Sequence, residues 1–143
     1  MPSFVTVTMR NVGGKMPSVL VVEDDYQLRR VVTNSLNELG FQYDEASNGR
    51  EALQKLCEAT SEGLMYDCIL LDIVMPEIDG WQVLEAVKSN PLWAPIKVVV
   101  LTGYANSPSD ASKVAKYDGV HIQKKGYFLQ TIGELLKRLL DGK

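Results

Sequence analysis

The stretch DCILLDIVMPEIDG, residues 67–80, decides which fold this chain adopts. Its apolar run, residues 68–71, ends abruptly on Asp72, and the turn residues Pro76 and Gly80 follow. A short apolar run bounded by turn residues is typical of a strand buried on both faces, as in a parallel sheet covered by helices. Asp72 then lies at the carboxyl end of a central strand, the edge where open α/β sheets bind ligands. Because a buried carboxylate is costly, this position predicts a functional group.

The composition is that of one ordinary globular domain. The chain has 143 residues, of which 45% are hydrophobic and 23% are charged. This is enough apolar material for one core, and it leaves no room for a second folded domain. The net charge of −3 lacks the basic excess of nucleic-acid-binding proteins, so we expect no direct contact with nucleic acid.

The cysteines and the hydropathy pattern bear on the compartment. Cys57 and Cys68 lie in apolar patterns without metal-type or CxxC spacing, so we expect two buried free thiols in a reducing compartment. No long apolar span and no signal-peptide pattern occurs in the sequence, so we expect no membrane insertion and a cytoplasmic location.

Strand and helix patterns alternate along the chain. Residues 1–16 are interpreted as a flexible leader, and residues 17–141 as the folded domain. Apolar runs predict strands over 18–22, 41–46, 68–72, 96–101 and 119–123. Helical spacing predicts helices over 26–39, after the N-cap Asn48, over 80–89, over 108–117 and over 128–140. The strand at 41–46 is the least apolar, which favours a position at a sheet edge.

This alternation predicts an α/β fold, a doubly wound five-stranded parallel sheet with helices on both faces. The weak second strand and the strongly apolar third favour the strand order 2-1-3-4-5. All strand ends then meet at one edge of the sheet.

Polar residues follow four of the predicted strands. Glu23 and Asp24 follow the first strand, Asp72 the third, Thr102 the fourth and Lys124 the fifth. In the predicted order the first and third strands are neighbours, so three carboxylates converge and repel one another. Mg²⁺ relieves this repulsion, because it prefers a few carboxylates, a backbone carbonyl and waters as ligands.

A cation, a hydroxyl and an ammonium around one carboxylate together describe a site for a phosphoryl group. The metal and Lys124 neutralise the phosphoryl oxygens, and the Thr102 hydroxyl donates a hydrogen bond to them. Asp72 is then the candidate nucleophile, forming an aspartyl phosphate.

Four blocks of sequence resemble the receiver domain of two-component response regulators. They are VVEDD at 21–25, LDIVMPEIDG at 71–80, LTG at 101–103 and IQK at 122–124. The resemblance covers residues 18 to about 140 and implies the flavodoxin-like (β/α)5 fold. It also implies that Asp72 is the phosphoacceptor, that Asp24 binds Mg²⁺ directly and that Glu23 acts on the metal through water.

The resemblance assigns the remaining site positions as well. The backbone carbonyl of Val74 matches a Mg²⁺ ligand, Thr102 the switch hydroxyl and Lys124 the lysine that contacts the phosphoryl group. Lys125 is the alternative lysine, and Lys124 is preferred because Ile122 then keeps the inward position. His121 matches the place of a rotating aromatic side chain, although a packed, half-buried histidine is the simpler expectation.

The resemblance implies a phosphorylation-dependent switch. The expected phosphoryl donor is a histidine kinase or a histidine phosphotransfer protein, and the output passes through an unknown downstream protein or through homodimerisation. We expect no enzymatic activity beyond Mg²⁺-dependent self-phosphorylation and self-dephosphorylation. Self-dephosphorylation should be slow, because Val74 and Tyr104 are bulky at positions that influence the access of water.

Three other functions remain open. A phosphatase of the haloacid dehalogenase type shares the aspartyl phosphate, but it needs a second acid where Val74 stands. A flavin carrier shares the strand order, but it needs a hydroxyl- or glycine-rich loop at residues 23–25, where acids stand. Those acids could serve only as helix-capping groups, and the chain would then be an interaction module that works without phosphorylation. Trp81 and Trp93 are expected to pack on the sheet.

Overall fold

The computed structural model describes residues 17–103 and 108–141 of the chain, with only the backbone given for residues 108, 125–130 and 141. The leader predicted over residues 1–16 and the residue Tyr104 lie outside the described residues.

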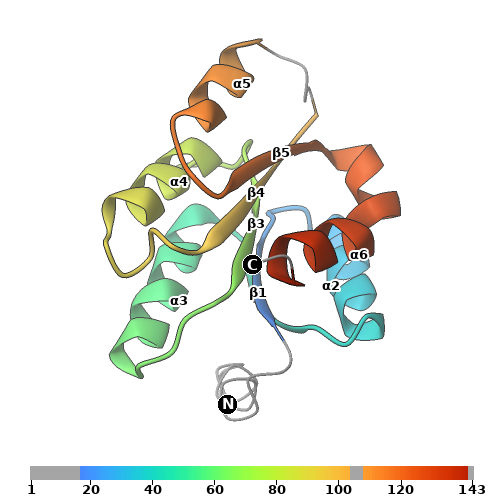
Figure 1. The fold of residues 1–143 in the computed structure, drawn as a ribbon, viewed down its shortest axis with the longest axis horizontal. Coiled ribbons are helices and arrows are strands. Elements are labelled where there is room, and N and C mark those ends of the chain that lie inside the picture. Colours follow the sequence, from blue (N-terminus) through green and yellow to red (C-terminus); the bar gives the residue numbers. More distant parts are fainter. Residues whose placement is uncertain (1–16, 104–107, 142–143) are drawn as a thin grey trace.

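Five strands alternate with five helices along the described residues (Figure 1). The strands are β1 (Ser18–Val22), β2 (Gln42–Ala46), β3 (Cys68–Asp72), β4 (Lys97–Thr102) and β5 (Val120–Lys124). The helices are α2 (Tyr26–Glu38), α3 (Gly49–Ser61), α4 (Gly80–Ser89), α5 (Pro108–Ala115) and α6 (Lys125–Asp141). The predicted elements are all present, and their ends agree with the prediction or differ by one or two residues, except that α6 begins three residues before its predicted start.

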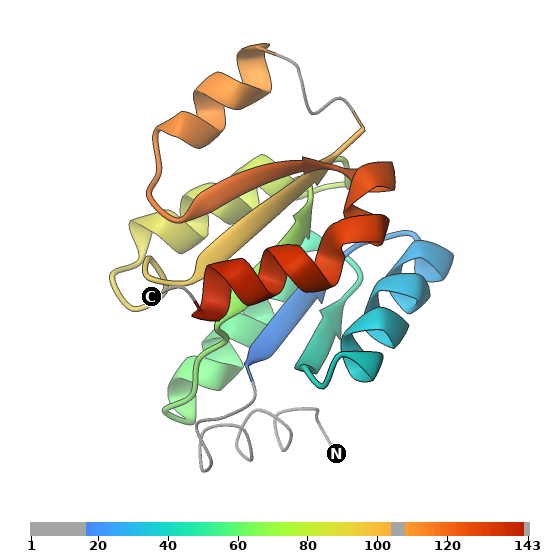
Figure 2. The same cartoon turned by 45° about the vertical axis from the view of Figure 1, so that its right-hand side comes forward.

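The sheet is parallel throughout and has the order β2-β1-β3-β4-β5. The predicted doubly wound fold and strand order are therefore confirmed. The polar strand β2 lies at one edge, as predicted, and β5 lies at the other. Figure 2 shows the resulting twist of the sheet between its two helical layers.

The sheet separates two apolar cores. Helices α3, α4 and α5 cover one face, and α2 and α6 cover the other (Figure 1). Successive strand residues point to opposite faces: Leu20 and Ile69 pack toward α3 and α4, whereas Val21 and Leu70 pack toward α2 and α6. The central strands β1 and β3 are buried along their whole length, which explains their continuous apolar runs.

The prediction for Cys57 is wrong, because this thiol is exposed while Cys68 is buried. The inward face of α3 carries Ala52, Leu56 and Ala59. Cys57 follows Leu56 directly, and one residue turns an α-helix by about 100°, so its side chain points to solvent.

Both tryptophans pack as predicted. Trp93 is buried, and its Nε1 donates a hydrogen bond to Thr60 Oγ1 at 2.8 Å. Trp81 packs against the core from α4, and the Lys113 ammonium of α5 lies 4.8 Å from the centre of its ring. Among the described residues no helix is long and apolar enough to cross a membrane.

Candidate functional site

The site begins where two neighbouring strands end. Val22 of β1 pairs with Leu71 of β3, so Glu23 and Asp72, the next residue along each chain segment, lie side by side at the carboxyl edge of the sheet. The backbone N–H of Glu23 donates to the carbonyl of Ala46 at 3.1 Å, which continues the β1–β2 ladder by one step. The register of the sheet therefore brings these carboxylates together, as the sequence predicted.

Glu23, Asp24 and Asp72 form a group of three carboxylates. One oxygen from each lies within 4.8 Å of the others. Glu23 is 2% and Asp72 1% exposed, whereas Asp24 is exposed. Hard oxygen ligands that are close together, with one side open to water, are the donors that Mg²⁺ prefers. The residues present therefore fit a Mg²⁺ ion.

The loop after β3 shapes the surroundings of Asp72. The backbone N–H of Val74 lies 3.3 Å from Asp72 Oδ1, to which it donates, and the Val74 side chain is 76% exposed. The N–H of Gly80 donates to the carbonyl of Ile73 at 2.9 Å and closes the loop. A Cβ on Gly80 would collide with the backbone of Asp72 and Ile73, so only glycine permits this close approach.

Asp79 begins helix α4 and has a capping role. Its side chain accepts a hydrogen bond from the N–H of Gln82 at 3.0 Å, and Gln82 Oε1 accepts from the N–H of Asp79 at 2.9 Å. This reciprocal pair is a capping box, which satisfies donors at the helix start. The capping box therefore fixes the start of α4 at Gly80.

Thr102 and Lys124 end the two strands on the other side of Asp72. Asp72 pairs with Leu101, and Thr102 pairs with Lys124 in the next ladder. Thr102 is 4% exposed, and Lys124 is exposed. Lys124 is the last residue of β5 while Lys125 opens α6, so Lys124 holds the strand-end position that the sequence assigned to it.

Arg29 lies at the site although nothing in the sequence pattern pointed to it. Its Nη1 donates to the backbone carbonyl of Glu23 at 2.7 Å, and its Nε donates to Glu45 Oε1 at 3.0 Å. The residue spacing does not predict these contacts, because they join Arg29, near the start of α2, to the loop before that helix and to β2.

His121 is exposed on the edge strand β5, which corrects the expectation of a half-buried side chain. Partial desolvation lowers the pKa of His121, and the charges of Lys97 and Arg138 lower it further. An edge strand lacks a neighbour on one side, so its side chains are less covered than the periodic pattern suggests.

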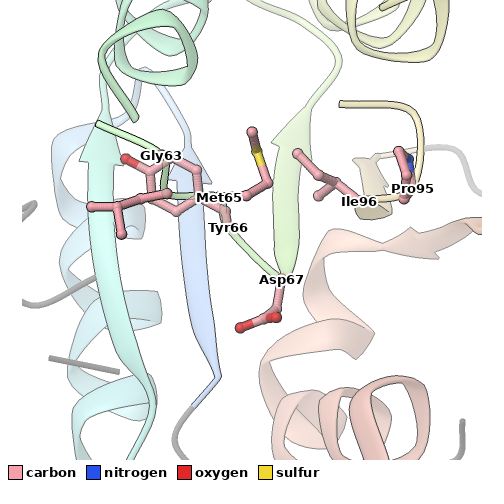
Figure 3. Close-up of a pocket in the computed structure, with 7 residues that line it drawn as sticks. Gly63, Met65, Tyr66, Asp67, Pro95 and Ile96 are labelled. Atoms are coloured by element: carbon pink, nitrogen blue, oxygen red, sulfur yellow. The ribbon is translucent and has the colours of Figure 1, made fainter. Parts of the chain in front are cut away.

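A hollow of about 470 Å³ opens at the amino-terminal ends of the strands, opposite to the end that carries the carboxylate group (Figure 3). It lies between the loops that precede β3 and β4, and Met65, Asp67 and Ile96 are among its lining residues. The Tyr66 hydroxyl donates to buried Asp44 at 2.8 Å, and Asp67 Oδ2 accepts from the N–H of Ser18 at 2.8 Å. These hydrogen bonds join the loop before β3 to β2 and β1. The hollow is separate from the carboxylate group.

The sequence matches the family model described as "Response regulator receiver domain" over residues 19–137. The response regulator receiver protein CpdR of Brucella abortus is 30% identical over 129 residues, which cover 87% of this chain and 98% of CpdR. The transcriptional regulatory protein PcoR of Escherichia coli is 37% identical over 81 residues, which cover 57% of this chain and 34% of PcoR. The match thus spans about a third of the length of that relative.

Solved structures that resemble this chain include proteins of the same family. The chemotaxis protein CheY4 of Vibrio cholerae superposes with a TM-score of 0.77 at 27% identity, covering 87% of this chain and 99% of CheY4. The receiver domain of a histidine kinase from Syntrophus aciditrophicus superposes with a TM-score of 0.75 at 29% identity, covering 88% and 91% of the two chains. The chain therefore belongs to the response regulator receiver domain family of two-component signalling systems.

Proposed function

We propose that this chain is a signalling switch that accepts a phosphoryl group on Asp72 in the presence of Mg²⁺. The observation that carries the proposal is the approach of three carboxylates, Glu23, Asp24 and Asp72, to within 4.8 Å at the carboxyl edge of the sheet. Without a cation this arrangement only costs free energy, so its presence supports a role in binding a metal and a phosphoryl group.

The metal would be held by the carboxylates of Asp24 and Asp72, by the backbone carbonyl of Val74 and by Glu23 through water. When bound, Mg²⁺ neutralises charge on the phosphoryl oxygens. The Thr102 hydroxyl donates a hydrogen bond to a phosphoryl oxygen, and the Lys124 ammonium offsets a second negative charge. The placement of Asp72, Thr102 and Lys124 at the ends of β3, β4 and β5 supports these roles.

The transfer is a displacement at phosphorus. A carboxylate oxygen of Asp72 forms a bond to the phosphorus of a phosphohistidine, and the bond from phosphorus to the histidine nitrogen breaks. The nitrogen keeps the bonding electron pair and takes up a proton, which returns the histidine to its neutral form. The donor is a histidine kinase or a histidine phosphotransfer protein, and the output passes to a downstream protein or through homodimerisation.

The alternative function, a phosphatase that hydrolyses an external phosphate ester, has less support. A haloacid dehalogenase-type phosphatase needs an acid two residues after its nucleophile, where this chain has Val74 with its side chain 76% exposed. We therefore propose no turnover of an external phosphate ester, only phosphorylation and slow dephosphorylation of the chain itself.

Intact mass after incubation with acetyl phosphate and Mg²⁺ tests the proposal. The wild-type chain should gain the mass of one phosphoryl group, and this gain should disappear in Asp72→Asn and when a chelator removes Mg²⁺. A folded wild-type chain that gains no mass would favour an interaction module that works without phosphorylation.

A further inference from the structure

Arg29 fixes the backbone beside the carboxylate group. Its Nη1 donates to the carbonyl oxygen of Glu23 at 2.7 Å, and its side chain is only 13% exposed. A hydrogen bond from a charged donor in such a covered position is short and strong. The guanidinium is itself held by Glu45 of β2, whose Oε1 lies 3.0 Å from Nε.

The Glu23 carbonyl belongs to the peptide unit that links Glu23 to Asp24. Because a peptide unit is planar, fixing this oxygen also fixes the nitrogen and Cα of Asp24, which is the exposed member of the carboxylate group. Asp24 follows the end of β1, so the regular strand pairing ends before it. Arg29 thereby ties the metal-binding turn to β2 through Glu45.

Two N–H groups of the guanidinium point to two different elements at once. Nε reaches β2 and Nη1 reaches the β1–α2 turn, which uses the fixed fork of donors that arginine alone provides. The Tyr26 ring also contacts this guanidinium, with its centre 5.5 Å from Cζ. A lysine ammonium in this place has no such rigid fork with which to hold both acceptors.

We propose that Arg29 is a positioning residue that holds Glu23 and Asp24 in the geometry that Mg²⁺ binding requires. This inference rests on the proposed metal site. Mg²⁺ demands nearly ideal octahedral geometry, and groups that orient metal ligands typically change metal affinity by about 10 to 100-fold when removed.

The positive charge of Arg29 and its positioning role have opposite effects on Mg²⁺ affinity. The charge repels a cation, so if charge alone mattered, removing Arg29 would tighten Mg²⁺ binding. If positioning matters, removing Arg29 weakens binding. The direction of the change therefore separates the two effects.

The experiment is a Mg²⁺ titration of the intact chain, followed by the amide chemical shifts of the β1–α2 turn. We expect Arg29→Met to raise the Kd for Mg²⁺ by about tenfold or more. Arg30→Met is the matched control, because Arg30 also pairs with Glu45, at 3.3 Å, while its Nη2 donates to Thr33 Oγ1, at 3.0 Å, and not to the turn that holds Glu23 and Asp24. Its Kd should stay within about twofold of the wild-type value, as expected for a partly exposed charge.

An unchanged or lower Kd in Arg29→Met would overturn the proposal while leaving the proposed function intact. A wild-type chain that binds no Mg²⁺ would overturn both. If Arg29→Met does not fold, as judged by its urea unfolding curve, Arg29→Lys decides, because it keeps the charge and loses the fork. The Kd of Arg29→Lys should rise severalfold, and a wild-type value there would overturn the proposal.

Discussion

At the scale of single residues, the candidate site depends on carboxylates in positions where burial of their negative charge destabilises the fold. Glu23 and Asp72 are almost fully buried, and exposed Asp24 lies beside them. Buried like charges destabilise a fold unless a cation or a network of hydrogen bonds compensates them. The Val74 N–H on Asp72 and the Asp25 N–H on Glu23 Oε2, at 3.1 Å, supply part of that compensation. Under the proposed function, a Mg²⁺ ion bound by these carboxylates would add to it.

The two cysteines should differ sharply in reactivity. Burial raises the pKa of Cys68 to about 12, with a further contribution from the charge of Asp67, whereas Cys57 is exposed. Only the thiolate reacts with a disulfide reagent. We therefore expect Ellman's reagent to titrate Cys57 in the native chain and Cys68 only after denaturation. Fast reaction of the native Cys57→Ser variant would contradict this assignment.

Gly80 should be intolerant of any side chain. The Cβ of Gly80→Ala would come 2.6 Å from Ile73 Cα and still closer to the carbonyl oxygen of Asp72, so the end of β3 would have to move. We expect a loss of about 1 to 3 kcal/mol in the free energy of unfolding, the usual cost of overpacking, measured by urea unfolding. Glu85→Ala, at an exposed position of the same helix, is the control, and equal midpoints for the two variants would show that the loop relaxes freely.

At the scale of elements, side-chain caps fix where the helices begin near the site. Asp25 caps α2 by accepting from the N–H groups of Gln27 and Leu28, and Asp79 caps α4 through its capping box. Asn48 caps α3 through the N–H of Glu51, at 2.8 Å. Each cap places a loop of the carboxyl edge at a defined point. Asp25 directly follows Asp24, and Asp79 lies seven residues after Asp72.

Glu51 makes the start of α3 sensitive to pH. Its carboxylate accepts hydrogen bonds from the backbone N–H and the hydroxyl of Ser47. The backbone bond is the main cause that lowers the pKa of Glu51 below its ordinary value of 4.5. A lowered pKa in the folded state gives stability that is present above the ordinary pKa and is lost as the pH falls through the folded-state pKa.

Glu51→Gln isolates this contribution. We expect the difference in unfolding free energy between the wild-type chain and Glu51→Gln to be largest near neutral pH and to shrink below pH 4.5, as followed by urea unfolding at a series of pH values. A difference that stays constant over this range would mean that the Ser47 bonds do not favour the charged form of Glu51.

At the scale of the whole molecule, a parallel sheet gathers every site residue at one edge. These residues come from four separate parts of the chain, yet each ends a strand or lies within two residues after one: Glu23 and Asp24 after β1, Asp72 in β3, Thr102 in β4 and Lys124 in β5. The sheet order makes their strands consecutive neighbours. The fold and the placement of these residues could be predicted from the sequence, because apolar runs reveal buried strands and parallel strands share one carboxyl edge.

Other features could not be read from the sequence for physical reasons. The exposure of Cys57 depends on the rotation of α3 about its axis, and that of His121 on the place of β5 at the edge of the sheet that the described strands form. The contacts of Arg29 depend on a long side chain that spans two elements. Periodicity predicts which elements form, but it does not predict where a flexible, charged side chain finds its acceptors.

The phosphorylated state should be long-lived. Val74 is apolar, 76% exposed and two residues after Asp72, and we propose that its side chain limits how water reaches the phosphoryl group. We expect Val74→Asn to lose its label faster than the wild-type chain, because a polar side chain admits and orients water. Time-resolved loss of the phosphoryl group with Mg²⁺ present measures both rates, and decay of the wild-type label within seconds would refute the prediction.

The most direct measurement identifies the atom that carries the phosphoryl group. The chain is treated with acetyl phosphate and Mg²⁺, the acyl phosphate is reduced with sodium borohydride, and peptide mass analysis locates the homoserine that forms from a phosphorylated aspartate. We predict homoserine at position 72 alone, dependent on Mg²⁺. Homoserine at position 24 or elsewhere, or a labelled chain with none at position 72, would contradict the assignment of Asp72 as the phosphoacceptor.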